Sequence, residues 1–174
     1  MPYRVDREER GGFTLVEIMI TLAILGILVV IAVSDFRGLN EKYNVEAETK
    51  QLYADLMDAR GRAMQRNRWF FVRISLDGYG YKTYEDSSPA PDGGGPPLDN
   101  IADTLVTSAT VRHVITNNLA GGNDFGFNRN GIASDNGTIR LSSTALPDYD
   151  CITIQMTRIK MGQYNAIGNT CAEK

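Results

Sequence analysis

The chain has few of the residues from which catalytic and metal sites are usually built. Its 174 residues include one histidine, two cysteines and one tryptophan. One histidine and two cysteines do not supply the ligand set of a zinc site. His113 has no sequence neighbour that forms a known motif with it, and we expect a structural or surface role for it. We therefore predict no enzyme activity, no bound metal and no cofactor.

Binding of phosphates and polyanions also finds little support. The net charge of −3 and the pI near 5.2 argue against a general binder of polyanions. The glycine run at 93–95 lacks the Lys-Ser/Thr and the helix that follow a phosphate-binding loop. Asp92, Asp99 and Asp103 do not have the spacing of an EF-hand, so we expect solvated loop acids rather than a calcium site.

A long apolar run does stand out, from Phe13 to Val33, and only Thr14, Glu17 and Thr21 place polar side chains in it. At roughly 1.5 Å per residue, such a helix would reach about 30 Å, the thickness of a bilayer core. The sequence therefore predicts a transmembrane helix over residues 13–34. A carboxylate inside such a span is costly, which marks Glu17 as a functional residue.

The small residues stand before this run, in Gly11-Gly12-Phe13-Thr14-Leu15-Val16-Glu17, and no Ala-x-Ala cleavage site follows it. This arrangement resembles the class III leader of type IV pilins and type II secretion pseudopilins. The resemblance implies that prepilin peptidase cuts between Gly12 and Phe13, removes residues 1–12 as a cytoplasmic leader, and methylates the new amino group of Phe13. The alternative is a plain single-pass anchor with a chance acid near its end.

The resemblance also gives Glu17 a role in assembly. In a stack of identical helices, the nearest positive charge is the new α-amino group of Phe13 on a neighbour. Burying that ion pair would fix the axial register between subunits, so we interpret Glu17 as a docking residue. The implied partners are other minor pilins or pseudopilins, the major subunit, prepilin peptidase and an inner-membrane assembly platform. The implied location is the bacterial inner membrane with the C-terminal domain in the periplasm, and then the pilus or pseudopilus.

Two details depart from the usual pattern of this family. Residues 1–12 carry three arginines and three acids, whereas such leaders are usually basic, which weakens the positive-inside signal. Ser34 stands where many pilins have proline. The helix should therefore be harder to melt or kink between Gly26 and Ser34, and its continuity in an assembled fibre stays open.

The helix is expected to continue past the span. Residues 35–66 contain no proline, and an apolar stripe follows helical spacing through Val45, Leu52, Leu56, Ala59 and Ala63. We predict that this amphipathic half, residues 35–66, packs on a sheet.

Residues 67–174 have the pattern of strands and turns. Residues 69–76 and 79–84 flank Asp77-Gly78, a hairpin signal, and a second such signal is Asn136-Gly137 before residues 138–141. Further strands are expected at 111–116, which contains His113, at 151–156, with Ile152, Ile154 and Met156 on one face, and at 158–161. Residues 87–100 form a loop rich in proline and glycine. One long helix followed by an antiparallel sheet is an α+β fold.

The segments 125–131, 137–141, 152–154 and 158–162 look like the GspH/FimT branch of minor pilins and pseudopilins. The resemblance implies a pilin-like fold with a globular domain over residues 67–174. It also implies a minor subunit at or near the tip of a type IV pilus or a type II secretion pseudopilus, which helps to initiate fibre assembly. A major fibre subunit is an alternative.

Cys151 and Cys171 are the only cysteines, and in an exported domain an isolated pair indicates a disulfide. It would close a loop of about 20 residues, worth roughly 3 kcal/mol. Two unpaired thiols are the alternative.

A DNA-binding minor pilin for natural transformation is a further alternative. Some FimT-type pilins bind DNA through Gly-Arg-x-Arg near the C-terminus, and Thr157-Arg158-Ile159-Lys160 is the matching stretch here. Arg158 and Lys160 would share one face of a strand, and Arg129 and Arg140 would add to the patch. Lysine in place of the second arginine removes a bidentate fork for phosphate, so solvated strand charges are the favoured interpretation.

Overall fold

The structure of the chain is a computed structural model that describes residues 12–86 and 103–174, without the side chains of residues 32–37. The chain divides into two units, Met1–Leu39 and Asn40–Lys174. Most of the predicted leader and the predicted loop at 87–100 lie outside the described residues, as do Asp92 and Asp99 of the acidic loop.

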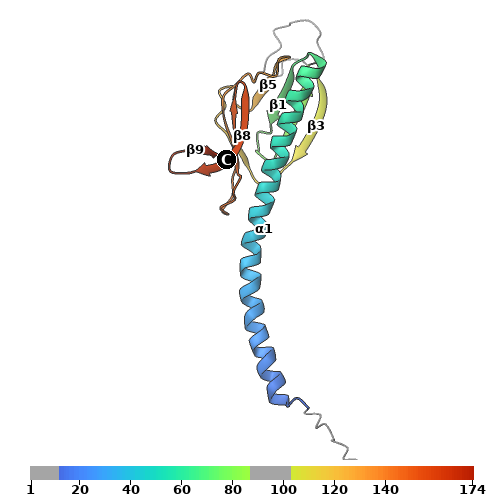
Figure 1. Ribbon diagram of the computed structural model, residues 1–174. Coiled ribbons are helices and arrows are strands. Elements are labelled where there is room, and N and C mark those ends of the chain that lie inside the picture. The colour runs from blue at the N-terminus through green and yellow to red at the C-terminus, as the bar shows by residue number, and fades with distance from the viewer. Residues whose placement is uncertain (1–11, 87–102) are drawn as a thin grey trace, which may run out of the picture. The chain divides into compact units, whose positions relative to one another are not determined.

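One helix, α1, covers Leu15–Arg66 and is followed by the strands shown in Figure 1. These are β1 (Phe70–Ile74), β2 (Gly80–Glu85), β3 (Thr104–Thr110), β4 (Ile115–Asn117), β5 (Asp124–Phe127), β6 (Gly137–Leu141), β7 (Cys151–Gln155), β8 (Arg158–Asn165) and β9 (Thr170–Glu173). The α+β prediction with one long N-terminal helix is confirmed.

The first unit contains the beginning of α1, and its apolar side chains are exposed. In the described parts of the chain, no helix is both long enough and apolar enough to cross a membrane. The predicted span, 13–34, includes residues 32–34, whose side chains lie outside the described part, so the span stays a prediction.

The second half of α1 belongs to the globular unit and buries the predicted stripe. The exposed fraction is at most 1% for each of its residues, Val45, Leu52, Leu56, Ala59 and Ala63. The helix ends because Asn67 adopts a left-handed conformation (φ 55°), and the N–H of Arg68 then reaches back to the carbonyl of Ala63 at 3.2 Å. This is a Schellman-type cap, in which asparagine takes the place of the more common glycine.

A four-stranded sheet has the order β3-β2-β1-β5, and each neighbouring pair is antiparallel. The predicted hairpin around Asp77-Gly78 is confirmed, with Gly78 at φ 75° in the turn between β1 and β2. Strand β3 was not predicted. Its residues are Thr- and Ser-rich and largely exposed at the sheet edge, so they lack a clear apolar alternation.

A second antiparallel sheet has the order β4-β6-β7-β8-β9, so the strands form two sheets rather than the single sheet that was expected. The predicted hairpin at Asn136-Gly137 is wrong, because β6 pairs with β4 and β7 while β5 lies in the other sheet. The tight turn lies earlier, at Gly131 (φ 72°), whose N–H donates to the carbonyl of Asn128 at 2.7 Å.

Three strand predictions need correction at their ends. The strand predicted over 111–116 begins only at Ile115, since the backbone N–H groups of Arg112 and His113 bind a helix side chain instead of a neighbouring strand. Ile152 and Ile154 lie on the predicted common face and are fully buried, but Met156 is 54% exposed because β7 ends before it. The strand predicted at 158–161 extends to residue 165, and β9 was not predicted.

A single hydrophobic core joins the helix to both sheets. It contains Leu52 and Leu56 from α1, Phe70 from β1, Ile139 from β6 and Ile152 from β7, all 1% exposed or less. The helix therefore holds the two sheets together in one globular unit, Asn40–Lys174.

Candidate functional site

The residues just before α1 form an exposed segment. Gly12, Phe13 and Thr14 have no regular secondary structure, and Phe13 is 80% exposed. The predicted cleavage bond between Gly12 and Phe13 therefore lies in accessible backbone directly ahead of the helix.

Thr14 caps the start of the helix. Its hydroxyl oxygen accepts the backbone N–H of Glu17 at 3.2 Å, so Thr14 is the N-cap residue and Glu17 lies in the first turn. A carboxylate there interacts favourably with the positive end of the helix dipole. Thr14-x-x-Glu17 also has the spacing of a capping box. This sequence signal indicates a helix-capping role for Glu17 in addition to the predicted docking role.

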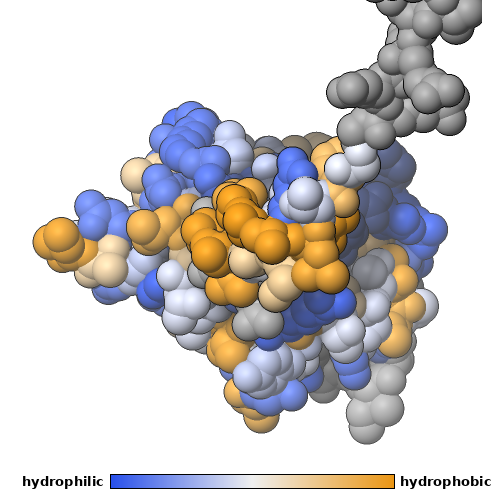
Figure 2. Space-filling model, turned by 90° about the horizontal axis from the view of Figure 1, so that it is seen from below, coloured by the Kyte–Doolittle hydropathy of each residue, from blue (hydrophilic) through white to orange (hydrophobic). Residues whose placement is uncertain are grey.

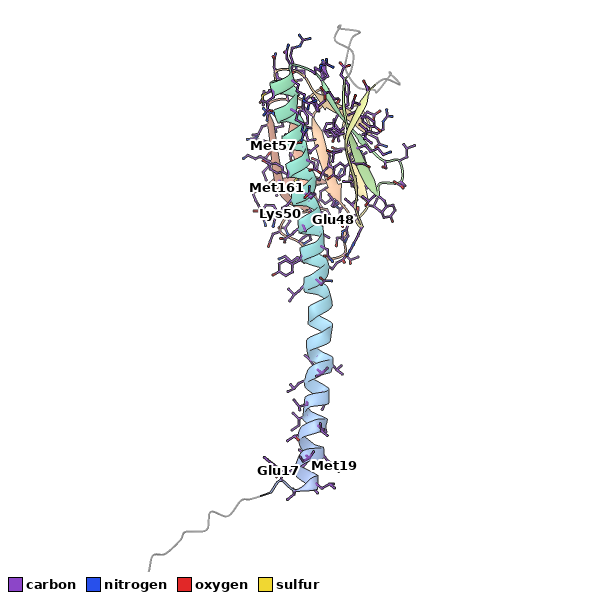
Figure 3. The ribbon with its side chains drawn as sticks, turned by 90° about the vertical axis from the view of Figure 1, so that its right-hand side faces the viewer. Glu17, Met19, Glu48, Lys50, Met57 and Met161 are labelled. Carbon is purple, nitrogen blue, oxygen red and sulfur yellow. A yellow bond between two sulfur atoms is a disulfide. The ribbon has the colours of Figure 1, made fainter. Side chains whose placement is uncertain are left out.

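Glu17 is an isolated acid among apolar residues. The exposed large side chains around it come from every side of the helix, and they are Leu15, Val16, Ile18, Met19, Ile20, Leu22, Ile24 and Leu25. Figure 3 labels Glu17 and Met19 near the N-terminal end of α1, and Figure 2 shows hydrophobic residues gathered where this end of the helix faces the viewer. Thr14 and Thr21 are the other polar side chains close to it, and the described surface of this first unit is otherwise largely apolar.

The predicted disulfide is confirmed, and it lies in the five-stranded sheet. Cys151 on β7 and Cys171 on β9 are bonded, with their Cα atoms 5.9 Å apart. Strand β8 runs between them, and its Gly162 pairs with Cys151. A Cβ atom on Gly162 would lie 2.1 Å from the carbonyl oxygen of Ala172, so only glycine fits beneath the bond.

The four basic residues of the candidate DNA patch do not form one free cationic surface. Arg158 and Lys160 lie on the same face of β8, and both pair with Glu173, at 3.0 and 3.4 Å. Arg129 lies in the exposed turn after β5, and the guanidinium of Arg140 stacks on the ring of Tyr164. One carboxylate thus partly neutralises the two cations of the matched motif.

His113 forms a partly buried cluster with two glutamates that the sequence did not reveal. Its Nδ1 lies 2.7 Å from Glu48 Oε2 and its Nε2 lies 2.9 Å from Glu41 Oε1, both on α1, and only 9% of the residue is exposed. Burial alone would lower the pKa of His113, but the hydrogen bonds to both carboxylates raise it above its ordinary value. Glu48 also accepts the backbone N–H groups of residues 112 and 113.

The cluster connects two distant segments of the chain, and the structural or surface role of His113 stays a prediction. The cluster connects the segment between β3 and β4 to the helix near Val45, where the apolar stripe begins. Glu41 and Glu48 are seven residues apart and lie near Val45 and Leu52 in the sequence. This spacing was the signal that could have identified the two glutamates as neighbours along the helix. The histidine lies so far along the chain that only the fold could pair it with them. Figure 3 shows Glu48 at the helix surface within the globular unit.

Comparison with known proteins gives two family matches and one structural match. The prokaryotic N-terminal methylation motif matches residues 9–33, and the family of type II transport protein GspH matches residues 48–158. The structure of the minor pseudopilin EpsH from the type 2 secretion system of Vibrio cholerae is similar, with a TM-score of 0.50 at 15% identity. The match covers 69% of this chain and 96% of that chain, which confirms the pilin-like fold. No curated protein matches the chain.

The two family matches cover the N-terminal segment and most of the globular unit. The first includes the exposed Gly12–Phe13 bond and Glu17, and the second includes more than half of the chain, from α1 to the start of β8. The chain therefore belongs to the family of the type II transport protein GspH.

Proposed function

We propose that this chain is a minor pseudopilin, a structural subunit that assembles at or near the tip of a type II secretion pseudopilus and helps to initiate it. The observation that carries the proposal is the N-terminal arrangement: an accessible Gly12–Phe13 bond, a capped helix start, and one acid in an otherwise apolar helix surface. Membership of the GspH family supports the secretion machine over a type IV pilus.

The chemistry of assembly follows from these residues. Cleavage by prepilin peptidase before Phe13 would create a new amino group, which methylation leaves able to carry a positive charge. The nearest fixed negative charge is a Glu17 carboxylate, four residues along. In an apolar environment an unpaired carboxylate is costly, so the Glu17 of one subunit and the Phe13 amine of a neighbour stabilise each other.

The rest of the subunit serves this packing. The apolar side chains of the first helical unit provide contact with lipid before assembly and with neighbouring helices afterwards. The globular unit would lie in the periplasm, an oxidising compartment that suits the Cys151–Cys171 disulfide. We propose the inner membrane as the site from which the subunit enters the fibre, with other pseudopilins and the assembly platform as its partners.

A DNA-binding role stays a weaker proposal. Such binding needs cations that are available to phosphates, and its affinity falls with salt. Arg158 and Lys160 share the carboxylate of Glu173, which they would have to leave to bind a phosphate. The matched motif also lacks its first glycine and second arginine.

The experiment that tests the proposal separates the two roles of Glu17. Glu17→Gln keeps the hydrogen-bonding capacity needed at a helix start but removes the charge, whereas Glu17→Ala removes both. We expect both variants to be processed and to remain in the membrane, and both to be lost from sheared pseudopili in a pull-down. Thr21→Val is the matched control, because Thr21 lies one turn further on and bonds only the carbonyl of Ile18.

Normal incorporation of Glu17→Gln would refute docking through charge and would leave Glu17 as a helix-capping residue. Loss of the Thr21→Val variant from the fibres as well would show that any change in this segment prevents assembly. Cleavage itself is checked by sequencing the N-terminus, which we expect to begin at Phe13.

A further inference from the structure

The outer face of the five-stranded sheet contains a polar pocket that no part of the proposed function uses. Thr138 and Arg140 alternate along β6 with Ile139 and Leu141, which lie in the core, so the first pair faces away from it. The pocket has a volume of about 230 Å³ and is lined by Thr116, Asn117, Asn118, Thr138, Arg140, Tyr164 and Asn169.

Arg140 is the only charged residue that lines this pocket. Its guanidinium carbon lies 3.9 Å from the centre of the Tyr164 ring, and its Nε atom is buried without a hydrogen-bond partner. In the described residues, no carboxylate forms an ion pair with it. Arg73, by contrast, binds Asp124 through two hydrogen bonds of 2.6 and 2.7 Å. Stacking therefore holds the Arg140 fork in place while leaving its donors unused.

Two amides of the pocket, Asn118 and Asn169, add further donors. The side-chain oxygen of Asn118 accepts the backbone N–H of Thr138 at 2.6 Å, and that of Asn169 accepts the Tyr164 hydroxyl. Each amide thus uses its oxygen inside the protein and keeps its NH₂ group for another partner. A pocket built in this way favours a ligand that accepts hydrogen bonds.

The charges around the pocket limit its ligand to at most one negative charge. Burial raises the pKa of the Asp150 carboxyl, and the nearby positive charge of Arg140 opposes part of this rise. Its Oδ1 atom is occupied by the backbone N–H of Tyr164, at 2.6 Å. One cation with an acid nearby can compensate a monoanion, but it compensates a phosphate dianion poorly.

We propose that this pocket binds a single carboxylate group, with the Arg140 fork as the main contact and the amides of Asn118 and Asn169 as further donors. The carboxylate comes either from an acidic side chain of a protein partner or from a small organic acid. The planar, bidentate geometry of a carboxylate matches the guanidinium fork. The proposal does not depend on the assembly role of Glu17, which lies in the other unit of the chain.

NMR of the full chain in detergent micelles tests the proposal. Acetate is added at constant ionic strength, with acetamide as the neutral control of the same shape. We expect saturable shifts of the Arg140 Nε–H and of the side-chain amides of residues 118 and 169 with acetate, and none with acetamide. Arg140→Gln should weaken acetate binding by about tenfold or more, because a hydrogen-bonded charge is lost.

Two further variants keep the result interpretable. Arg129→Gln removes an exposed arginine outside the pocket and should bind acetate normally. Arg140→Lys keeps the charge but loses the planar fork, so we expect it to bind acetate with intermediate affinity. This variant tests the proposal even if Arg140→Gln folds poorly.

The two sources of the carboxylate are distinguished with the peptide Gly-Asp-Gly amide. Tighter binding of the peptide than of acetate supports a protein side chain, and binding of acetate alone supports a small acid. Three results would overturn the proposal. The first is shifts that do not saturate with acetate, and the second is acetate affinity reduced equally in the Arg129→Gln and Arg140→Gln variants. The third is tighter binding of inorganic phosphate than of acetate.

Discussion

Removal of the Cys151–Cys171 bond should cost the globular unit about 3 kcal/mol of stability. The two cysteines are 20 residues apart, and closing a loop of that length restricts the unfolded chain by roughly this amount at 25 °C. The backbone pairings of β7 with β8 and of β8 with β9 do not depend on the bond, so the sheet can keep them when the bond is absent. The variant Cys151→Ala/Cys171→Ala is therefore expected to fold but to unfold at a lower concentration of urea.

Trp69 provides the assay, because it is the one tryptophan of the chain and lies in the globular unit. Its ring stacks on Phe71, with the ring centres 6.0 Å apart, so its fluorescence should change on unfolding. With a urea dependence of about 1–3 kcal/mol/M for a domain of this size, the midpoint should fall by about 1–3 M.

A reductant provides the matched control. It should shift the midpoint of the native protein by a similar amount and leave the double alanine variant unchanged. A shift well below 1 kcal/mol in both experiments would refute the argument from loop closure. An equal effect of the reductant on the variant would show that something other than this bond responds to it.

Two further predictions concern the helix and its contacts in the globular unit. Because the folded pKa of His113 lies above its unfolded value, its contribution is present below pH 6.5 and is lost as the pH rises through the folded pKa. The free energy of unfolding should therefore fall from pH 6 to pH 8 in the native protein more than in His113→Gln, and equal pH profiles would contradict the pairing with Glu41 and Glu48. Leu52→Ala should cost about 2–5 kcal/mol in urea unfolding, because Leu52 is fully buried. Met57→Ala, at a 40% exposed position of the same helix, should cost much less, and a similar loss in both would contradict the observed packing.

Local patterns predicted much of the fold. The stripe from Val45 to Ala63 has helical spacing, and every member is buried. Asp77-Gly78 marks the hairpin of β1 and β2, because glycine readily adopts the positive φ that the turn requires. The one pair of cysteines could form only one disulfide within the chain, and it does. In each case, the signal lies in a few residues close in sequence.

The failed predictions involve partners far apart in sequence. Asn136-Gly137 has the residues of a hairpin turn, but β6 pairs with β4, so the local signal was overridden by the pairing of distant strands. The segment at 111–114 has β-branched residues, yet the N–H groups of Arg112 and His113 bind Glu48 of the helix. Met156 continues the alternation of β7, but the strand ends before it at the turn into β8.

The N-terminal pattern can be recognised from the sequence by itself, since the methylation motif, Glu17 and the apolar run are contiguous and need no fold to be found. The sequence also determined the helix and its buried face, because helical spacing is a local property. Only the tertiary structure decided the division into two sheets, the burial of His113 between two glutamates, and the neutralisation of Arg158 and Lys160 by Glu173. These depend on strand pairing and on charges brought together from distant segments, whose energies arise only when the chain has folded.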